Sequence, residues 1–81
     1  MGKKEKIKDR LLSRQGWHNF SLNDIDTLLR SIGFTHARTS GSHQVYVNKT
    51  IGKIVNIQSV NGKCKPYQLG QILDIIKEHN L

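Results

Sequence analysis

The 81-residue sequence predicts an α+β domain, in which a three-stranded antiparallel sheet carries helices on one face in the order α-β-β-β-α, with an extra helix at the N-terminus. Apolar residues recur with helical spacing in two segments, and the residues between those segments alternate with the period of strands. A chain of this length buries only about 60% of its unfolded surface. We therefore expect one domain over residues 1–81, with a basic helical extension (1–20) ahead of an αβββα core (21–81).

The segment Lys3–Ser13 has the pattern of a short amphipathic helix that ends at Gln15-Gly16. Its apolar residues lie about one turn apart among lysines, and they are Ile7, Leu11 and Leu12. The same composition also fits a frayed basic tail, so both interpretations stay open.

The next helix has clearer signals at both ends. Ser21 can cap it with Asp24 three residues on, and Gly33 can stop it. Its expected buried stripe is Leu22, Ile25, Leu28, Leu29 and Ile32. A closing helix is expected from Pro66 to about Glu78, because proline is tolerated at a first helical position. Its apolar residues are Leu69, Ile72, Leu73 and Ile76.

Three short alternating runs between the helices predict an antiparallel meander. They are Phe34–Thr39, Ser42–Asn48 and Lys53–Gln58, with turns at Ser40-Gly41 and Asn48–Gly52. Ser59–Lys65 is expected to be a polar loop around Asn61-Gly62. This order is the layout of double-stranded RNA-binding domains and of small proteins unrelated in function, so it assigns no activity.

The net charge of +7 favours a polyanionic partner. Residues 34–65 hold five basic and no acidic side chains, and residues 1–20 hold six basic and two acidic ones. The lone Cys64 offers no disulfide, and no Cys/His spacing suggests a metal site. No segment resembles a membrane span or a signal peptide, so we expect a soluble, cytoplasmic protein.

His43 is the candidate catalytic residue. Gly41-Ser42 brings the backbone through a tight turn just before it, which is expected to leave the imidazole near a sheet edge and open to a ligand. A positioned histidine can take or give a proton at neutral pH, which is worth about 10² to 10⁴ in rate. From spacing alone, the simpler interpretation is that His43 is an ordinary strand residue. Alternation does not decide which side of its strand faces the helices.

Lys63 and Lys65 precede a helix start, where the helix dipole, backbone N–H groups and two ammonium groups can converge on a phosphate. An ordinary solvated loop is the alternative. Trp17, Tyr46 and Tyr67 could stack on bases, but single aromatic residues in so small a protein are more simply core or rim residues. The histidines His18, His36 and His79 are most simply surface or rim residues, and Cys64 is a small packing residue. Asp24 and Asp26 are best explained as helix-start charges.

The stretches RTSGSHQVYV (38–47) and NGKCKPYQLGQILDIIKEHNL (61–81) resemble the HicA family, the toxin half of a bacterial type II toxin-antitoxin pair. The chain is similar in particular to the longer subgroup with a basic helix ahead of the core, so the likeness runs from about Lys3 to Leu81. Gly-Ser-His, a β-run, GKxKPYQ and an amphipathic last helix form a fairly specific combination.

The resemblance implies a metal-independent endoribonuclease that cleaves mRNA, needs no cofactor and is silenced by a HicB-type antitoxin. The family's catalytic histidine falls on His43, and Gly41 and Ser42 are expected to contact RNA with it. Many members have a second histidine next, where this chain has Gln44, so one imidazole is left for proton transfer. The residues expected to stabilise phosphoryl charge are Lys63 and Lys65 first, then Lys53 or Arg38.

Two other classes of function remain open from the sequence. A non-catalytic RNA-binding module of the same fold would use the same lysines on duplex phosphates, and its binding would be salt-sensitive and independent of His43. A basic interaction subunit would pair with an acidic protein and show no affinity for RNA.

Overall fold

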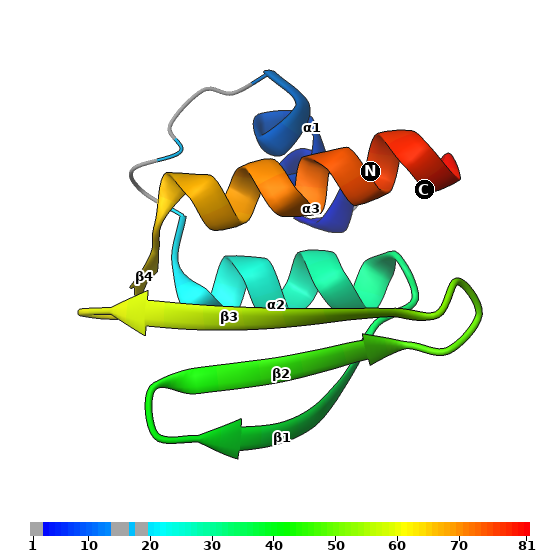
Figure 1. The fold of residues 1–81 in the computed structure, drawn as a ribbon. Helices are drawn as coiled ribbons and strands as arrows, with labels where there is room; N and C mark the ends of the chain where they lie inside the picture. Colours follow the sequence, from blue (N-terminus) through cyan, green and yellow to red (C-terminus); the bar gives the residue numbers. More distant parts are fainter. Residues whose placement is uncertain (1–2, 14–16, 18–19) are drawn as a thin grey trace.

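The computed structural model describes residues 3–13, 17 and 20–81, and its architecture is the expected α+β one. A four-stranded antiparallel sheet, in the order β1-β2-β3-β4, carries the helices on one face (Figure 1). The elements are α1 (Lys3–Ser13), α2 (Leu22–Ser31), β1 (Thr35–Ser40), β2 (His43–Asn48), β3 (Lys53–Val60), β4 (Lys63–Cys64) and α3 (Pro66–His79). The predicted fold class is therefore confirmed, with one more short strand than expected.

The N-terminal segment is a helix packed into the core. Ile7 and Leu11 of α1 are buried, and α1 lies against α2 and α3. Arg10 forms an ion pair with Asp24 of α2 at 3.5 Å, and its guanidinium lies 4.4 Å from the centre of the Phe20 ring. The expected helix end at Gln15-Gly16 lies outside the described residues.

Helix α2 begins and ends where its sequence signals indicate. Ser21 and Asp24 form a capping box, since the Asp24 N–H donates to Ser21 Oγ at 3.0 Å and the Ser21 N–H donates to Asp24 Oδ2 at 3.5 Å. Gly33 has a φ of 100°, and a Cβ there would lie 3.0 Å from Asn48 Nδ2. The positive φ and the close approach of the Asn48 side chain therefore both favour glycine at the end of α2.

Two side chains of β2 fix which face of the sheet meets the helices. The Tyr46 hydroxyl donates to Asp26 of α2 at 2.6 Å, and the buried Asn48 donates to the Ile32 carbonyl at 3.2 Å. Burial would raise the pKa of Asp26, but hydrogen bonds from Tyr46 and Arg30 outweigh it and lower that pKa. The even-numbered residues of β2 therefore face the helices.

The predicted loop Ser59–Lys65 is instead a second hairpin, which corrects that part of the prediction. Strand β3 runs on to Val60, and Asn61 and Gly62 both have positive φ (53° and 76°), the signature of a type I′ turn. The short β4 follows, and its Cys64 N–H donates to the Phe20 carbonyl at 3.1 Å. This hairpin ties the start of α2 to the start of α3.

Helix α3 is joined to the free edge of β3 by a side chain. In the amide orientation that satisfies both of its polar atoms, buried Gln68 donates to the Gln58 carbonyl at 2.9 Å and accepts from the Gln58 N–H at 2.7 Å. One glutamine thus replaces a neighbouring strand at Gln58 and holds the first turn of α3 beside β3. The buried residues of α3 include the whole expected stripe, Leu69, Ile72, Leu73 and Ile76.

Candidate active site

The turn ahead of His43 is a two-residue hairpin loop formed by Gly41 and Ser42. Gly41 has a φ of 61°, and no positive φ occurs at Ser42, as in a type II′ turn. A Cβ on Gly41 would meet no atom within 4 Å, so the backbone conformation, and not space, calls for glycine. The turn makes His43 the first residue of β2.

His43 lies on the face of the sheet that none of the described helices covers, which we call the open face (Figure 1). Since Gln44, Tyr46 and Asn48 face the helices, strand alternation places His43 on the opposite side, and its side chain is exposed. The expectation of a position near a sheet edge was wrong, because β2 is an interior strand. The ring is accessible because the open face is uncovered and the strand ends there.

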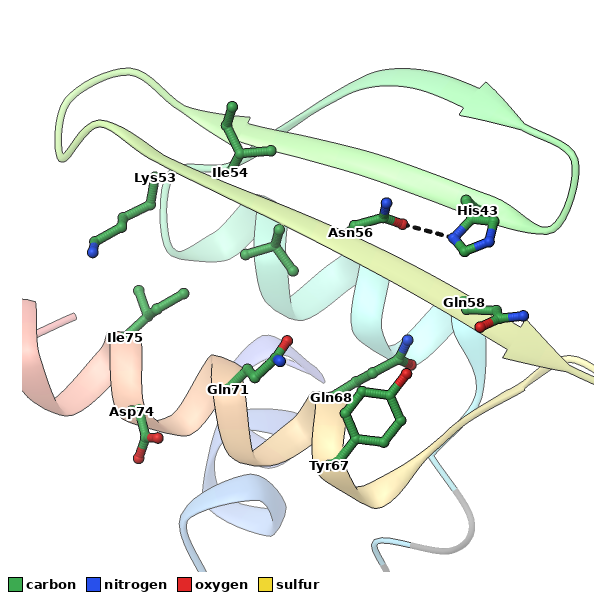
Figure 2. A pocket seen from close by; sticks show the side chains of 11 residues that line it. His43, Lys53, Ile54, Asn56, Gln58, Tyr67, Gln68, Gln71, Asp74 and Ile75 are labelled. Atoms are coloured by element: carbon green, nitrogen blue, oxygen red, sulfur yellow. Dashed lines mark hydrogen bonds between the residues drawn. The ribbon is translucent and has the colours of Figure 1, made fainter.

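Asn56 of β3 holds the His43 ring. Its Oδ1 lies 3.0 Å from His43 Nδ1 across the two strands (Figure 2). His43 pairs with Gln58 in the β2–β3 ladder, so Asn56 is its diagonal neighbour on the same face. This contact fixes one ring nitrogen and leaves Nε2 directed away from it. The sequence analysis did not identify Asn56.

Gln44 lies on the other face of the sheet from His43. Its side-chain oxygen is 2.8 Å from His36 Nε2, and His36 lies edge-on to the Tyr46 ring, 5.4 Å between centroids. A histidine at position 44 would therefore lie with His36 and not with His43. Gln44, which stands where many family members have a second histidine, therefore does not remove an imidazole from the open face.

A groove of about 700 Å³ runs along the free edge of β3, between that strand and α3, and His43 lies at one end of it (Figure 2). The wall at the His43 end carries Asn56 and Gln58 from β3, and Tyr67 and Gln71 from α3. Lys53 and Asp74 line the opposite end. We call this the β3–α3 groove, and its end at His43 is lined by uncharged amides and one tyrosine ring.

The predicted cationic residues lie at different places in the sheet relative to His43. Arg38 is exposed on β1 opposite Val45, hence on the open face and diagonal to His43. Lys63 of β4 pairs with Val60, so β3 lies between Lys63 and the strand that carries His43. Lys65 is the N-cap of α3. Neither lysine is among the described residues that line the groove. Lys53 pairs with Asn48, at the far end of the ladder.

The remaining candidates have structural roles or lie apart from His43. His79 is half-buried at the end of α3, 3.8 Å from Glu78, and His18 lies outside the described residues. Cys64 is buried, and burial raises the pKa of its thiol to about 11, as expected for a packing residue. In the described part of the chain, no group of three or more potential ligands is placed to hold a metal ion. None of the described helices is long and apolar enough to span a bilayer.

Comparison with known families decides the relationship. Residues 23–80 match the family described as HicA toxin of bacterial toxin-antitoxin. The chain belongs to the HicA toxin family. This confirms the resemblance seen in the Gly41-Ser42-His43 and GKCKPYQ stretches, both of which lie inside the match. No curated protein and no solved structure matches the chain.

Membership in the HicA family makes the chain a toxin of a toxin-antitoxin pair. The family is of the mRNA interferase type, which places the chain in general terms among endoribonucleases, with an RNA substrate and an antitoxin partner. Helix α1 precedes the matched residues. Buried Ile7 and Leu11 and the Arg10–Asp24 ion pair join it to the HicA core.

Proposed function

We propose that this HicA toxin cleaves mRNA in the cytoplasm without a metal ion, that His43 is its general base, and that a HicB-type antitoxin silences it. The observation that carries the proposal is an exposed imidazole whose Nδ1 lies 3.0 Å from Asn56 Oδ1. With the Asn56 oxygen as acceptor, Nδ1 carries the ring proton and Nε2 carries the free lone pair. Nε2 is then the atom that accepts a proton from substrate.

The reaction that fits a single imidazole is attack by a neighbouring hydroxyl of the substrate itself. His43 Nε2 takes the proton of a ribose 2′-OH, and the 2′ oxygen bonds to the adjacent phosphorus. The bond from phosphorus to the 5′ oxygen breaks, and that oxygen takes up a proton. The products are a 2′,3′-cyclic phosphate and a 5′-hydroxyl. DNA lacks the 2′-OH and is inert in this scheme.

Cationic groups on both sides of His43 would stabilise the charge that builds on the phosphoryl oxygens. Arg38 reaches the open face from β1. Lys63 and Lys65 approach from the β4–α3 side, where Lys65 caps a 14-residue helix whose N-terminus favours anions. Lys53 is better placed to bind a phosphate further along the RNA.

Replacing Asn56 by aspartate is expected to move the pH–rate profile. A carboxylate beside the imidazole favours the protonated ring, so the free base forms only at higher pH. The rising limb of kcat against pH should shift upward by about one pH unit. The measurement is cleavage at saturating RNA from pH 5 to pH 9, so that weaker binding does not contribute.

Asn56→Ala is the control, because it removes the hydrogen bond and adds no charge. Its kcat should fall while the midpoint of the rising limb stays in place. An unchanged midpoint in Asn56→Asp would show that Asn56 does not contact the catalytic base.

The proposed function is tested by incubating the purified chain with single-stranded RNA and with DNA of the same sequence, both in EDTA. We expect scission of the RNA alone. Intact RNA, together with salt-sensitive binding that His43→Ala leaves unchanged, would instead establish the non-catalytic RNA-binding module. The antitoxin is tested by expressing the chain with the product of a neighbouring acidic reading frame, which should copurify and stop cleavage.

A further inference from the structure

Tyr67 is an exposed aromatic residue at the His43 end of the β3–α3 groove (Figure 2). Its side chain is 58% exposed, whereas Tyr46, Phe20 and Phe34 are at most 2% exposed. Tyr67 lies in the first turn of α3, immediately after Pro66 and two residues after the N-cap Lys65. Packing of the domain therefore does not account for this ring.

The surroundings of Tyr67 suit a nucleobase. The ring lines the β3–α3 groove at the end that holds His43, and Gln71 lies one turn further along the same side of α3 (Figure 2). The Gln58 side chain lines the same end of the groove from β3. Aromatic rings stack on bases, and amide side chains can donate to and accept from base edges. A flat, partly apolar ring beside free amides provides both kinds of contact.

The charges around Tyr67 fit the sugar-phosphate chain of the same nucleotide. No acidic residue lines the His43 end of the groove in the described part of the chain, and Asp74 lies toward Lys53. Tyr67 lies two residues after the N-cap Lys65, at a helix N-terminus that favours anions. A base over Tyr67 would thus have a phosphate within reach of the N-terminus of α3, in the groove that His43 also lines.

We propose that the substrate site takes single-stranded RNA, and that the base next to the scissile phosphate leaves the stack and lies on the Tyr67 ring. This deepens the proposed function and rests on it for the identity of the ligand. Bases inside a duplex are stacked on their neighbours and are not available to Tyr67. Although the fold is that of double-stranded RNA-binding domains, the groove selects unpaired RNA.

The test measures the binding of fully 2′-O-methylated RNA, which cannot be cleaved, by fluorescence anisotropy. Tyr67→Ala should weaken binding of a single strand about 5- to 150-fold, the range for the loss of one stacked base. Tyr67→Phe keeps the ring and should bind within about twofold of the unaltered protein. Ile54→Ala is the matched control, since Ile54 is 69% exposed in the same groove but has no ring.

Cleavage of unmodified RNA supplies the second measurement. Tyr67→Ala should raise KM by a similar factor, and an RNA duplex of the same sequence should compete poorly with the single strand. Equal losses in Tyr67→Ala and Ile54→Ala would indicate general apolar contact and overturn the stacking proposal. Unaltered single-strand affinity in Tyr67→Ala, or preference for the duplex, would also overturn it.

These outcomes are separable from failure of the nuclease proposal. A chain that binds methylated single strands through Tyr67 but cuts no RNA would retain the stacking site and lose the chemistry. A chain that cuts RNA through His43 with no dependence on Tyr67 would retain the chemistry and lose the stacking site.

Discussion

His43→Ala is expected to lower the rate of RNA cleavage by about 10² to 10⁴, the range that positioned acid-base catalysis supplies. The substitution removes the nitrogen that accepts the 2′-OH proton and leaves the phosphate-binding groups in place. Because the side chain is exposed on the open face, the fold should be unaffected. Initial rates on single-stranded RNA in EDTA measure the effect, and circular dichroism checks that the melting temperature is kept.

His36→Ala is the matched control for that variant. His36 is also a histidine of the sheet, but it lies on the face of Gln44, 2.8 Å from its oxygen. Its loss should leave the cleavage rate within about threefold of the original. Full activity in His43→Ala, or an equal loss in His36→Ala, would mean that the proton is removed elsewhere.

The second large effect concerns the helix ahead of the family match. Leu11 of α1 is fully buried against the core, so Leu11→Ala should lower the free energy of unfolding by about 2 to 5 kcal/mol. A small domain has only about 5 to 15 kcal/mol in total, so the loss is a substantial share of its stability. The shift of the urea midpoint at constant slope measures the loss.

Leu12 provides the control at the next position. It belongs to the same helix but is 44% exposed, and Leu12→Ala should cost less than about 1 kcal/mol. If both variants unfold at the same urea concentration as the original chain, α1 is a detachable basic tail. The expected difference between the two would instead make α1 an integral part of the HicA domain.

Local signals were sufficient to predict most elements. The cap at Ser21 follows from capping chemistry, which acts within a few residues, and the helix over Lys3–Ser13 was one of the two interpretations that its spacing left open. The β4 strand was missed because two residues, Lys63 and Cys64, are too short to show alternation. The Asn61-Gly62 turn was the available signal for that hairpin, since this pair favours a type I′ turn.

The faces of β2 could not be predicted because they depend on distant partners. Both alternating sets of β2 contain apolar residues, and the choice is made by Asp26 and the Ile32 carbonyl on α2. Asn56 was within reach of the sequence, because pairing Asn48 with Lys53 across the four-residue loop places it diagonally to His43. The β3–α3 groove could not be predicted, because the sequence does not show where α3 lies over the edge of β3.

The most direct test of the account uses DNA strands that each contain one ribonucleotide, at a different position in each member of a pool. If His43 activates a 2′-OH, the chain in EDTA should cut only at the phosphate on the 3′ side of the ribonucleotide. Mass spectrometry should then find a 2′,3′-cyclic phosphate and a 5′-hydroxyl, and neither should form with His43→Ala. Cuts at deoxyribonucleotides, 5′-phosphate ends or undiminished scission by His43→Ala would contradict the account.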